Sequence, residues 1–300
     1  MAFNWKTFQT RTLTAIVFAA VMLTGLLWNQ WSFLVLFSII HFGCWWEYFK
    51  LIEKINNTTI DKVAKYVFIF AGYIFMITMS LINTTYEIWF SIAGIEIDLK
   101  WLLWTSTLGL LLIFLFQNKT VPQKAKWMCL AGLAYISLSW GLMLNLRSLW
   151  SDFEGFKVLI DFGYTIPILI IASIWINDTM AYIVGSLIGK TQLSKYSPKK
   201  TWEGTIGGIL LSIVVVGFLF IQLAKSGNVY PFVQNAWWFV IPAIASIVGT
   251  LGDLLESKLK RMAGVKDSGS IMPGHGGFLD RFDSLLLAVP AVWLFVYFLM

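Results

Sequence analysis

The stretch GTIGGILLSIVVVGFLFIQLA, from Gly204 to Ala224, contains no charged side chain. A helix needs about 20 mostly apolar residues to cross the hydrocarbon core of a bilayer, so this stretch is long enough to span a membrane. Eight other stretches meet the same requirement. The sequence therefore predicts an all-α, polytopic integral membrane protein with about nine transmembrane helices, at residues 12–28, 31–49, 63–82, 101–117, 127–146, 162–181, 204–224, 236–254 and 284–300.

The composition of the 300-residue chain supports this fold class. Hydrophobic residues make up 58% of it and charged residues only 13%, whereas a soluble domain has about 25% charged residues. So few polar side chains cannot cover a soluble globule of this size, which excludes a soluble enzyme, a disordered chain and a secreted disulfide scaffold. The two cysteines, Cys44 and Cys129, lie inside apolar stretches, so the sequence offers no cysteine-based zinc site.

Basic residues are distributed unevenly between the two sides of the predicted helices. If the N-terminus is cytoplasmic, 18 of the 22 Lys and Arg residues face the cytoplasm, and the other side holds Lys100, Arg147, Lys157 and Lys225. Because basic residues collect on the cytoplasmic side of membrane proteins, we expect the N-terminus inside and the C-terminus outside, in the inner (plasma) membrane. The net charge of +6 then reports topology and predicts no nucleic-acid partner.

Acidic residues of the C-terminal region gather on the predicted cytoplasmic side, several of them at or inside the ends of spans. Ionisable groups in such places are functional candidates. We therefore expect residues 161–300 to be the catalytic region and residues 1–160 to be a scaffold of helices, together forming one integrated membrane domain. The acids concerned are Asp178, Glu203, Asp253, Glu256, Asp267, Asp280 and Asp283.

The richest polar stretch, GDLLESKLKRMAGVKDSGSIMPGHGGFLDRFD, runs from Gly252 to Asp283. Its first part places acids, a hydroxyl and bases three or four residues apart, so a helix leaving the membrane presents them on one side. These residues are Asp253, Glu256, Ser257, Lys260 and Arg261.

The rest of this stretch combines a glycine-rich loop with two carboxylates. The run from Pro273 to Gly277, PGHGG, cannot be helical, and its backbone N–H groups can crowd around an anion such as a phosphate. Asp280 and Asp283, three residues apart in the first turn of the last helix, point the same way. Two such oxygen ligands favour a divalent cation such as Mg²⁺, although acids at a helix N-terminus also complement the helix dipole without a metal. The combination indicates metal-assisted phosphate chemistry.

A second polar stretch, NDTMAYIVGSLIGKTQLSKYSPKKTWEGTIGG, runs from Asn177 to Gly208. Lys195, Lys199 and Lys200 flank a Ser-Pro pair in it and offer cationic donors near the membrane surface. A basic loop attracted to anionic lipid is the alternative interpretation.

The order of these motifs resembles the signature of the phosphatidate cytidylyltransferases, also called CDP-diglyceride synthases. The similarity rests on Ser257, Lys260-Arg261, Lys266-Asp267, Pro273 to Gly277, Asp280-Arg281-x-Asp283, Asp178-Thr179 and the run SPKKTWEG from Ser197 to Gly204. It covers residues 170–285, and Trp46-Glu47-Tyr48 adds a shorter similarity upstream. The resemblance implies a nucleotidyltransferase of phospholipid biosynthesis that transfers CMP from CTP to phosphatidate, giving CDP-diacylglycerol and pyrophosphate.

The resemblance also implies roles for individual residues. Asp253, Asp280 and Asp283 would hold Mg²⁺, as one or two metal ions, on the CTP phosphates. Phosphates would be bound by Lys260, Arg261, Lys266 and Arg281, with a hydrogen bond from His275. The substrate would be enclosed by Ser197, Lys199, Lys200, Thr201, Ser257, Gly274, Gly276 and Gly277. Asp178 and Asp267 would bind metal indirectly or orient a lysine.

Two other functions remain open at this point. A CTP-dependent kinase of a polyprenol or similar lipid alcohol would share the membrane architecture and the nucleotide. A transporter would use intramembrane acids as an ion path, but the polar residues collect at one surface. CTP, phosphatidate and membrane lipids are the expected partners, and the sequence leaves acyl-chain preference and assembly, including a homodimer, open.

Overall fold

The computed structural model describes residues 5–82, 89–92, 95–117, 121–148, 162–226, 236–270 and 276–299. The chain forms two compact units. Unit 1 consists of Met1–Tyr164 and Met262–Arg281, and unit 2 consists of Thr165–Arg261 and Phe282–Met300.

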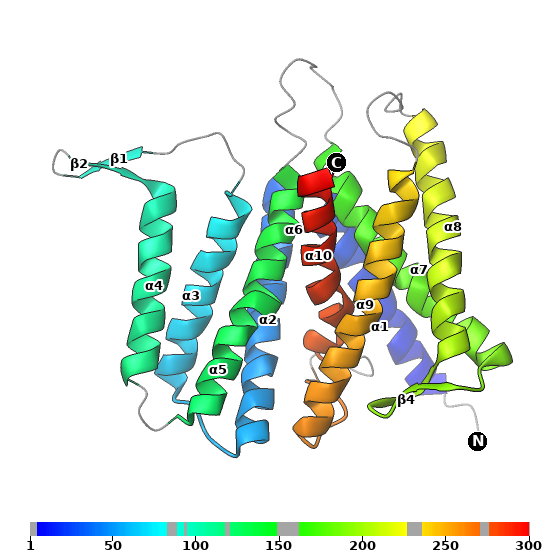
Figure 1. Cartoon of the computed structure of the whole chain (residues 1–300), viewed down its shortest axis with the longest axis horizontal. Helices are drawn as coiled ribbons and strands as arrows, with labels where there is room; N and C mark the ends of the chain where they lie inside the picture. Colours follow the sequence, from blue (N-terminus) through cyan, green and yellow to red (C-terminus); the bar gives the residue numbers. More distant parts are fainter. Residues whose placement is uncertain are drawn as a thin grey trace. The chain divides into compact units, whose positions relative to one another are not determined.

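Unit 1 is built mainly of long helices (Figure 1). The Asn29 side chain accepts a hydrogen bond from the Ser32 backbone at 2.8 Å and Ser32 Oγ accepts one from the Asn29 N–H at 3.0 Å, a capping box that fixes where the second helix begins. The elements are α1 (Trp5–Leu27), α2 (Gln30–Asn56), α3 (Lys62–Ser80), β1 (Trp89–Ile92), β2 (Ile95–Asp98), α4 (Leu99–Gln117), α5 (Gln123–Gly132), the π-helical turn η1 (Leu133–Ser137), α6 (Leu138–Ser148) and the 3₁₀ turn η2 (Phe162–Tyr164).

Aromatic side chains form the core of unit 1. Trp45 of α2 and Trp140 of α6 are fully buried, and the Trp45 ring lies 5.2 Å from that of Phe68 in α3. The indole N–H of Trp45 donates to Ser137 Oγ at 2.9 Å, which satisfies its one polar atom inside the core. These contacts fix α2 firmly within unit 1.

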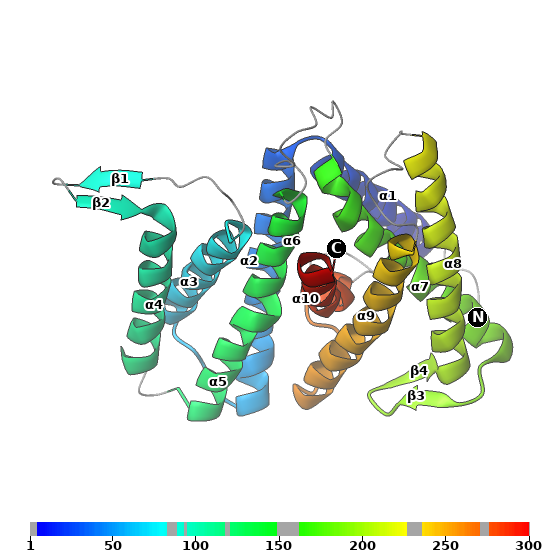
Figure 2. The same ribbon diagram turned by 45° about the horizontal axis from the view of Figure 1, so that its top comes forward.

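Unit 2 contains α7 (Thr165–Ile188), β3 (Gln192–Ser194), β4 (Ser197–Thr201), α8 (Trp202–Ser226) and most of α9 (Trp237–Met262) and α10 (Leu279–Leu299). α7 and α8 lie side by side (Figures 1 and 2). A Cβ atom on Gly204 would come within 2.6 Å of the Ala181 carbonyl oxygen and 2.8 Å of Gly185 Cα. Small residues at this contact let the two helices approach closely, as is typical of helices in membranes.

The predicted fold class is confirmed, because each predicted span overlaps a helical segment over nearly its whole length. Within the described residues, eight segments are long and apolar enough to cross a membrane, and α1 contributes a shorter apolar part, Ile16–Leu27. The chain is therefore a mainly helical, multi-pass membrane protein.

Several helices continue beyond the predicted spans. α2 extends to Asn56, α9 extends to Met262, and α10 already begins at Leu279. A span that is predicted from apolarity ends close to the next charged residues. The helix itself continues as long as its backbone hydrogen bonds and one apolar face are kept. The added turns carry Glu256 of α9 and both Asp280 and Asp283 of α10.

The expected basic loop after α7 is an antiparallel hairpin of β3 and β4, which pairs Gln192 with Thr201 and Ser194 with Ser197 (Figure 2). Glu203, in the first turn of α8, accepts hydrogen bonds from the backbone N–H groups of Lys190 and Thr191 at 3.1 Å. This carboxylate ties the base of the hairpin to α8 and so gives the lysines of β4 a defined position.

Candidate active site

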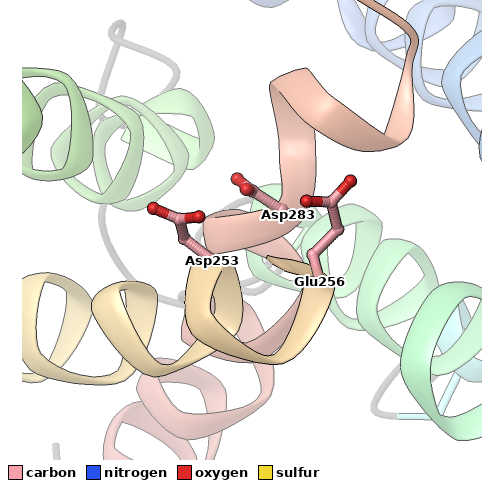
Figure 3. Close-up of side chains that lie close together, drawn as sticks. All are labelled: Asp253, Glu256 and Asp283. Carbon is pink, nitrogen blue, oxygen red and sulfur yellow. The ribbon is translucent and has the colours of Figure 1, made fainter. Parts of the chain in front are cut away.

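Three carboxylates come together in unit 2. Asp253 and Glu256 lie one turn apart on α9, and Asp283 belongs to α10 (Figure 3). One oxygen from each carboxylate lies within 4.8 Å of the other two. The period of the helix explains the first two, since residues three apart share a face.

Gly252 allows α9 and α10 to approach closely at this cluster. A Cβ atom there would lie 2.6 Å from the Asp283 carbonyl oxygen and 3.1 Å from Ser284 Cα. A residue with a side chain would therefore push the helices apart and separate Asp253 from Asp283.

Two lysines neutralise part of the charge of this cluster. Lys200 of β4 forms an ion pair with Asp253, and Lys260 forms one with Glu256 one turn away on α9. Burial disfavours the ammonium of Lys200, but the carboxylates of Asp253, Asp178 and Asp283 outweigh that cost, so the pKa of Lys200 is raised above its ordinary value. Ser257 Oγ also donates to Asp253 Oδ1 at 3.3 Å.

The donor set fits a divalent cation. Glu256 is fully buried, with 0% of its side chain exposed in the pair with Lys260. Two lysines beside three carboxylates leave a net negative charge among these side chains, and carboxylate oxygens are the ligands that hard cations prefer. The acidic cluster could therefore hold a metal ion.

The β3–β4 hairpin places the other candidate residues of the second polar stretch. The backbone carbonyl of Tyr196, at the tip, accepts from Arg261 Nε of α9 at 3.4 Å. Lys199 is exposed and Ser197 is partly exposed, while Thr201 Oγ1 accepts from the Gly204 N–H at 3.2 Å at the start of α8. Asp178 is exposed on α7 and its Oδ1 lies 3.5 Å from the amide of Asn177.

Asp280 lies in a different set of contacts, within unit 1. Its Oδ2 accepts hydrogen bonds from the backbone N–H groups of Ser268 at 2.9 Å and Gly277 at 2.8 Å, and Ser268 Oγ lies 2.9 Å from the same oxygen. Gly276 has φ +83°, and a Cβ there would lie 2.7 Å from the same oxygen. Among the described residues, the three-carboxylate group contains Asp283 but not Asp280. The described contacts of the two carboxylates differ, and a role of Asp280 as a metal ligand stays a prediction.

The remaining predicted residues are placed only in part. Lys266, Asp267 and Arg281 are exposed in unit 1. Gly274 and His275 lie outside the described residues. Sequence reasoning left Glu256 out of the metal ligands, although its position three residues after Asp253 was a usable signal.

The helices and the acidic cluster with its lysines define a polytopic membrane protein with a charged site. Residues 9–299 match the Cytidylyltransferase family, and the chain belongs to that family. It is therefore a nucleotidyltransferase.

Three similar proteins carry the name phosphatidate cytidylyltransferase. The chain is 34% identical to the one from Staphylococcus saprophyticus over 287 residues, which is 94% of this chain and 96% of that protein. It is 42% identical to the one from Synechocystis sp. over 164 residues, 53% of either chain. It is 42% identical to the one from Thermotoga maritima over 135 residues, 45% of this chain and 50% of that one. The match thus spans about half the length of the last two relatives and nearly all of the first.

Proposed function

We propose that this protein is a phosphatidate cytidylyltransferase, which converts CTP and phosphatidate to CDP-diacylglycerol and pyrophosphate. The observation that carries the proposal is the cluster of Asp253, Glu256 and Asp283 with Lys200 and Lys260 paired to it. The relatives named above support the choice of substrates. Carboxylates beside lysines suit a reaction that must bring two polyanions together.

The reaction needs charge stabilisation more than it needs a protein base. A phosphomonoester loses its second proton near pH ~6, so the phosphate of phosphatidate is already a nucleophile at neutral pH. One of its oxygens attacks the α-phosphorus of CTP, a new P–O bond forms, and the bond to the bridging oxygen breaks to release pyrophosphate. Fixed cations stabilise the charge that develops on the leaving group.

We assign the metal ligands to Asp253, Glu256 and Asp283, and a bound Mg²⁺ would supply charge neutralisation at the CTP phosphates. Lys200 and Lys260 already lie at these carboxylates and would bind phosphate oxygens. Exposed cations would bind the remaining phosphates of lipid and nucleotide, namely Lys199, Arg261, Lys266 and Arg281. Ser257 orients Asp253 through its hydrogen bond.

The proposal includes an orientation in the inner membrane, with the site facing the cytoplasm. Cysteine labelling tests it cleanly, because Cys44 and Cys129 are both buried. In intact cells, Lys195→Cys should resist an impermeant thiol reagent and Asp98→Cys should react with it. Labelling of Lys195→Cys from outside would overturn the orientation.

The function is tested by incubating the purified protein with CTP, Mg²⁺ and either phosphatidate or a polyprenol. Pyrophosphate release that requires phosphatidate is expected. Release of CDP with the polyprenol would instead identify a lipid-alcohol kinase. Asp61→Asn is the matched control for acid substitutions, because Asp61 only caps α3 by accepting from the Val63 N–H at 2.9 Å.

A further inference from the structure

Glu47 is a fully buried carboxylate in the membrane-spanning helix α2, with 0% of the residue exposed. Its Oε2 accepts a hydrogen bond from Ser268 Oγ at 2.8 Å and another from the Leu279 N–H at 2.9 Å. Both donors are more than 200 positions away in the sequence and belong to unit 1 with Glu47. The carboxylate therefore holds a distant segment against α2.

Two glycines leave the space that this carboxylate fills. A Cβ atom on Gly269 or on Gly277 would overlap the carboxylate of Glu47, and a Cβ on Gly43, one turn earlier in α2, would overlap the ring of Phe278. The backbone on both sides of residues 270–276 thus lies directly against α2. One side chain fixes both flanks of the glycine-rich loop.

The same contacts lead to Asp280. Ser268 Oγ lies 2.8 Å from Glu47 Oε2 and 2.9 Å from Asp280 Oδ2, and the Ser268 N–H also donates to Asp280. Leu279 N–H, in the first turn of α10, donates to Glu47. Glu47 therefore sets the position of the first turn of α10, from which Asp280 projects.

We propose that Glu47 is a positioning residue for the reaction: it fixes both flanks of the glycine-rich loop and the Asp280 carboxylate, and thereby the binding of CTP. This inference rests on the proposed function. The Ser268 hydroxyl and the Leu279 N–H both need an acceptor oxygen at the position of Glu47 Oε2. The inference therefore assigns Glu47 a hydrogen-bonding role, and its effect reaches the nucleotide only through Ser268, Leu279 and Asp280.

Two substitutions separate this role from charge and from packing. Glu47→Gln keeps an acceptor oxygen for Ser268 and Leu279, whereas Glu47→Met keeps the length of the side chain and removes the acceptor. Glu53 on the same helix provides the matched control, since it pairs with Lys65 at 2.8 Å and accepts from the Ile60 N–H at 2.7 Å. Ser268→Ala is a second, milder way to break the same contact.

The first measurement is hydrogen exchange of the full-length protein in detergent, which needs no catalytic activity. We expect the amides of Ser268, Gly277 and Leu279 to exchange at least about 10-fold faster in Glu47→Met, and near the wild-type rate in Glu47→Gln and Glu53→Gln. Unchanged exchange in Glu47→Met would show that Glu47 does not hold Ser268, Gly277 and Leu279 in place, which would overturn the inference. If Glu47→Met does not fold, Ser268→Ala gives the same comparison.

The second measurement is kcat and KM for CTP per folded enzyme. Loss of two hydrogen bonds should lower kcat/KM for CTP about 30-fold in Glu47→Met, through a higher KM or a lower kcat. In Glu47→Gln, kcat/KM should change less than about 5-fold. Equal losses of kcat/KM in Glu47→Gln and Glu47→Met would show that the charge of Glu47 matters. Unchanged kcat and KM in Glu47→Met would show a purely structural role. Each outcome would overturn the inference. If the wild-type enzyme itself makes no CDP-lipid, the proposed function fails. The exchange rates would still show whether Glu47 holds these segments in place.

Discussion

Lys200, on β4, forms an ion pair with Asp253, on α9, across 53 positions of the sequence. The hairpin therefore places the ammonium group of Lys200 at the acidic cluster, and not at the membrane surface. Lys199, its neighbour, is exposed. The ion pair therefore distinguishes Lys200 from the exposed lysine beside it.

Replacement of Lys200 by Gln should therefore impair the reaction in a way that lipid does not repair. Hydrogen bonds to charged groups contribute about 1.5–3 kcal/mol, so we expect kcat/KM for CTP to fall about 10- to 100-fold. Steady-state kinetics in mixed micelles with increasing anionic lipid provide the measurement. Lys195→Gln, at an exposed lysine of the same hairpin, is the matched control, and full recovery of Lys200→Gln by anionic lipid would remove Lys200 from the site.

Replacement of Asp283 by Asn should weaken metal binding and turnover together. Loss of a carboxylate ligand is expected to lower kcat at least about 100-fold, equivalent to roughly 3 kcal/mol of transition-state stabilisation. The Mg²⁺ concentration for half-maximal activity should rise. Asp253→Asn and Glu256→Gln should behave alike. Normal Mg²⁺ dependence in all three variants would show that the acids only satisfy Lys200 and Lys260.

Replacement of Asp280 by Asn should give a different result, since the contacts of Asp280 are with Ser268 and Gly277. We expect kcat to fall about 10-fold or more through weaker hydrogen bonds to the loop flanks. The Mg²⁺ dependence should stay that of the wild type. A shift as large as that in Asp283→Asn would place Asp280 among the metal ligands.

Replacement of Gly252 by Ala should separate α9 from α10. The new Cβ would meet the Asp283 carbonyl oxygen at 2.6 Å, and forcing extra volume into a packed contact costs about 1–3 kcal/mol. A lower Tm in detergent together with lost activity is expected. Gly109→Ala is the control, because a Cβ there meets nothing within 4 Å. Equal Tm values for the two variants would contradict the close approach.

The helices and the acids of α9 follow from local rules in the sequence. Apolar stretches of membrane length predict the spans, and the spacing of Asp253 and Glu256 predicts their common face. Such rules could not predict the ion pair of Lys200 with Asp253, because it joins a hairpin to a helix far along the chain. No local pattern in the second polar stretch signalled the hairpin itself, which is tied down by the carboxylate of Glu203.

The separate environments of Asp280 and Asp283 show the same limit. Residues three apart on a helix differ in direction by about 60°, so spacing alone leaves room for two sets of neighbours. Ser268 and Gly277 bind the first carboxylate, while α9 supplies the neighbours of the second. In the sequence, Glu47 stood out only as the middle residue of the short Trp46-Glu47-Tyr48 similarity. Its importance depends on Ser268 and Leu279, which only the folded chain brings to it.

In the proposed reaction, a lipid receives the α-phosphate of CTP. The direct measurement uses the purified protein, Mg²⁺ and phosphatidate with CTP labelled either at the α- or at the γ-phosphate, followed by extraction of the lipids. We expect only the α-label to enter the lipid fraction, and only with phosphatidate present. Asp253→Asn should abolish the transfer. Entry of the γ-label into a lipid alcohol, or no transfer of the α-label to phosphatidate, would contradict the proposed reaction.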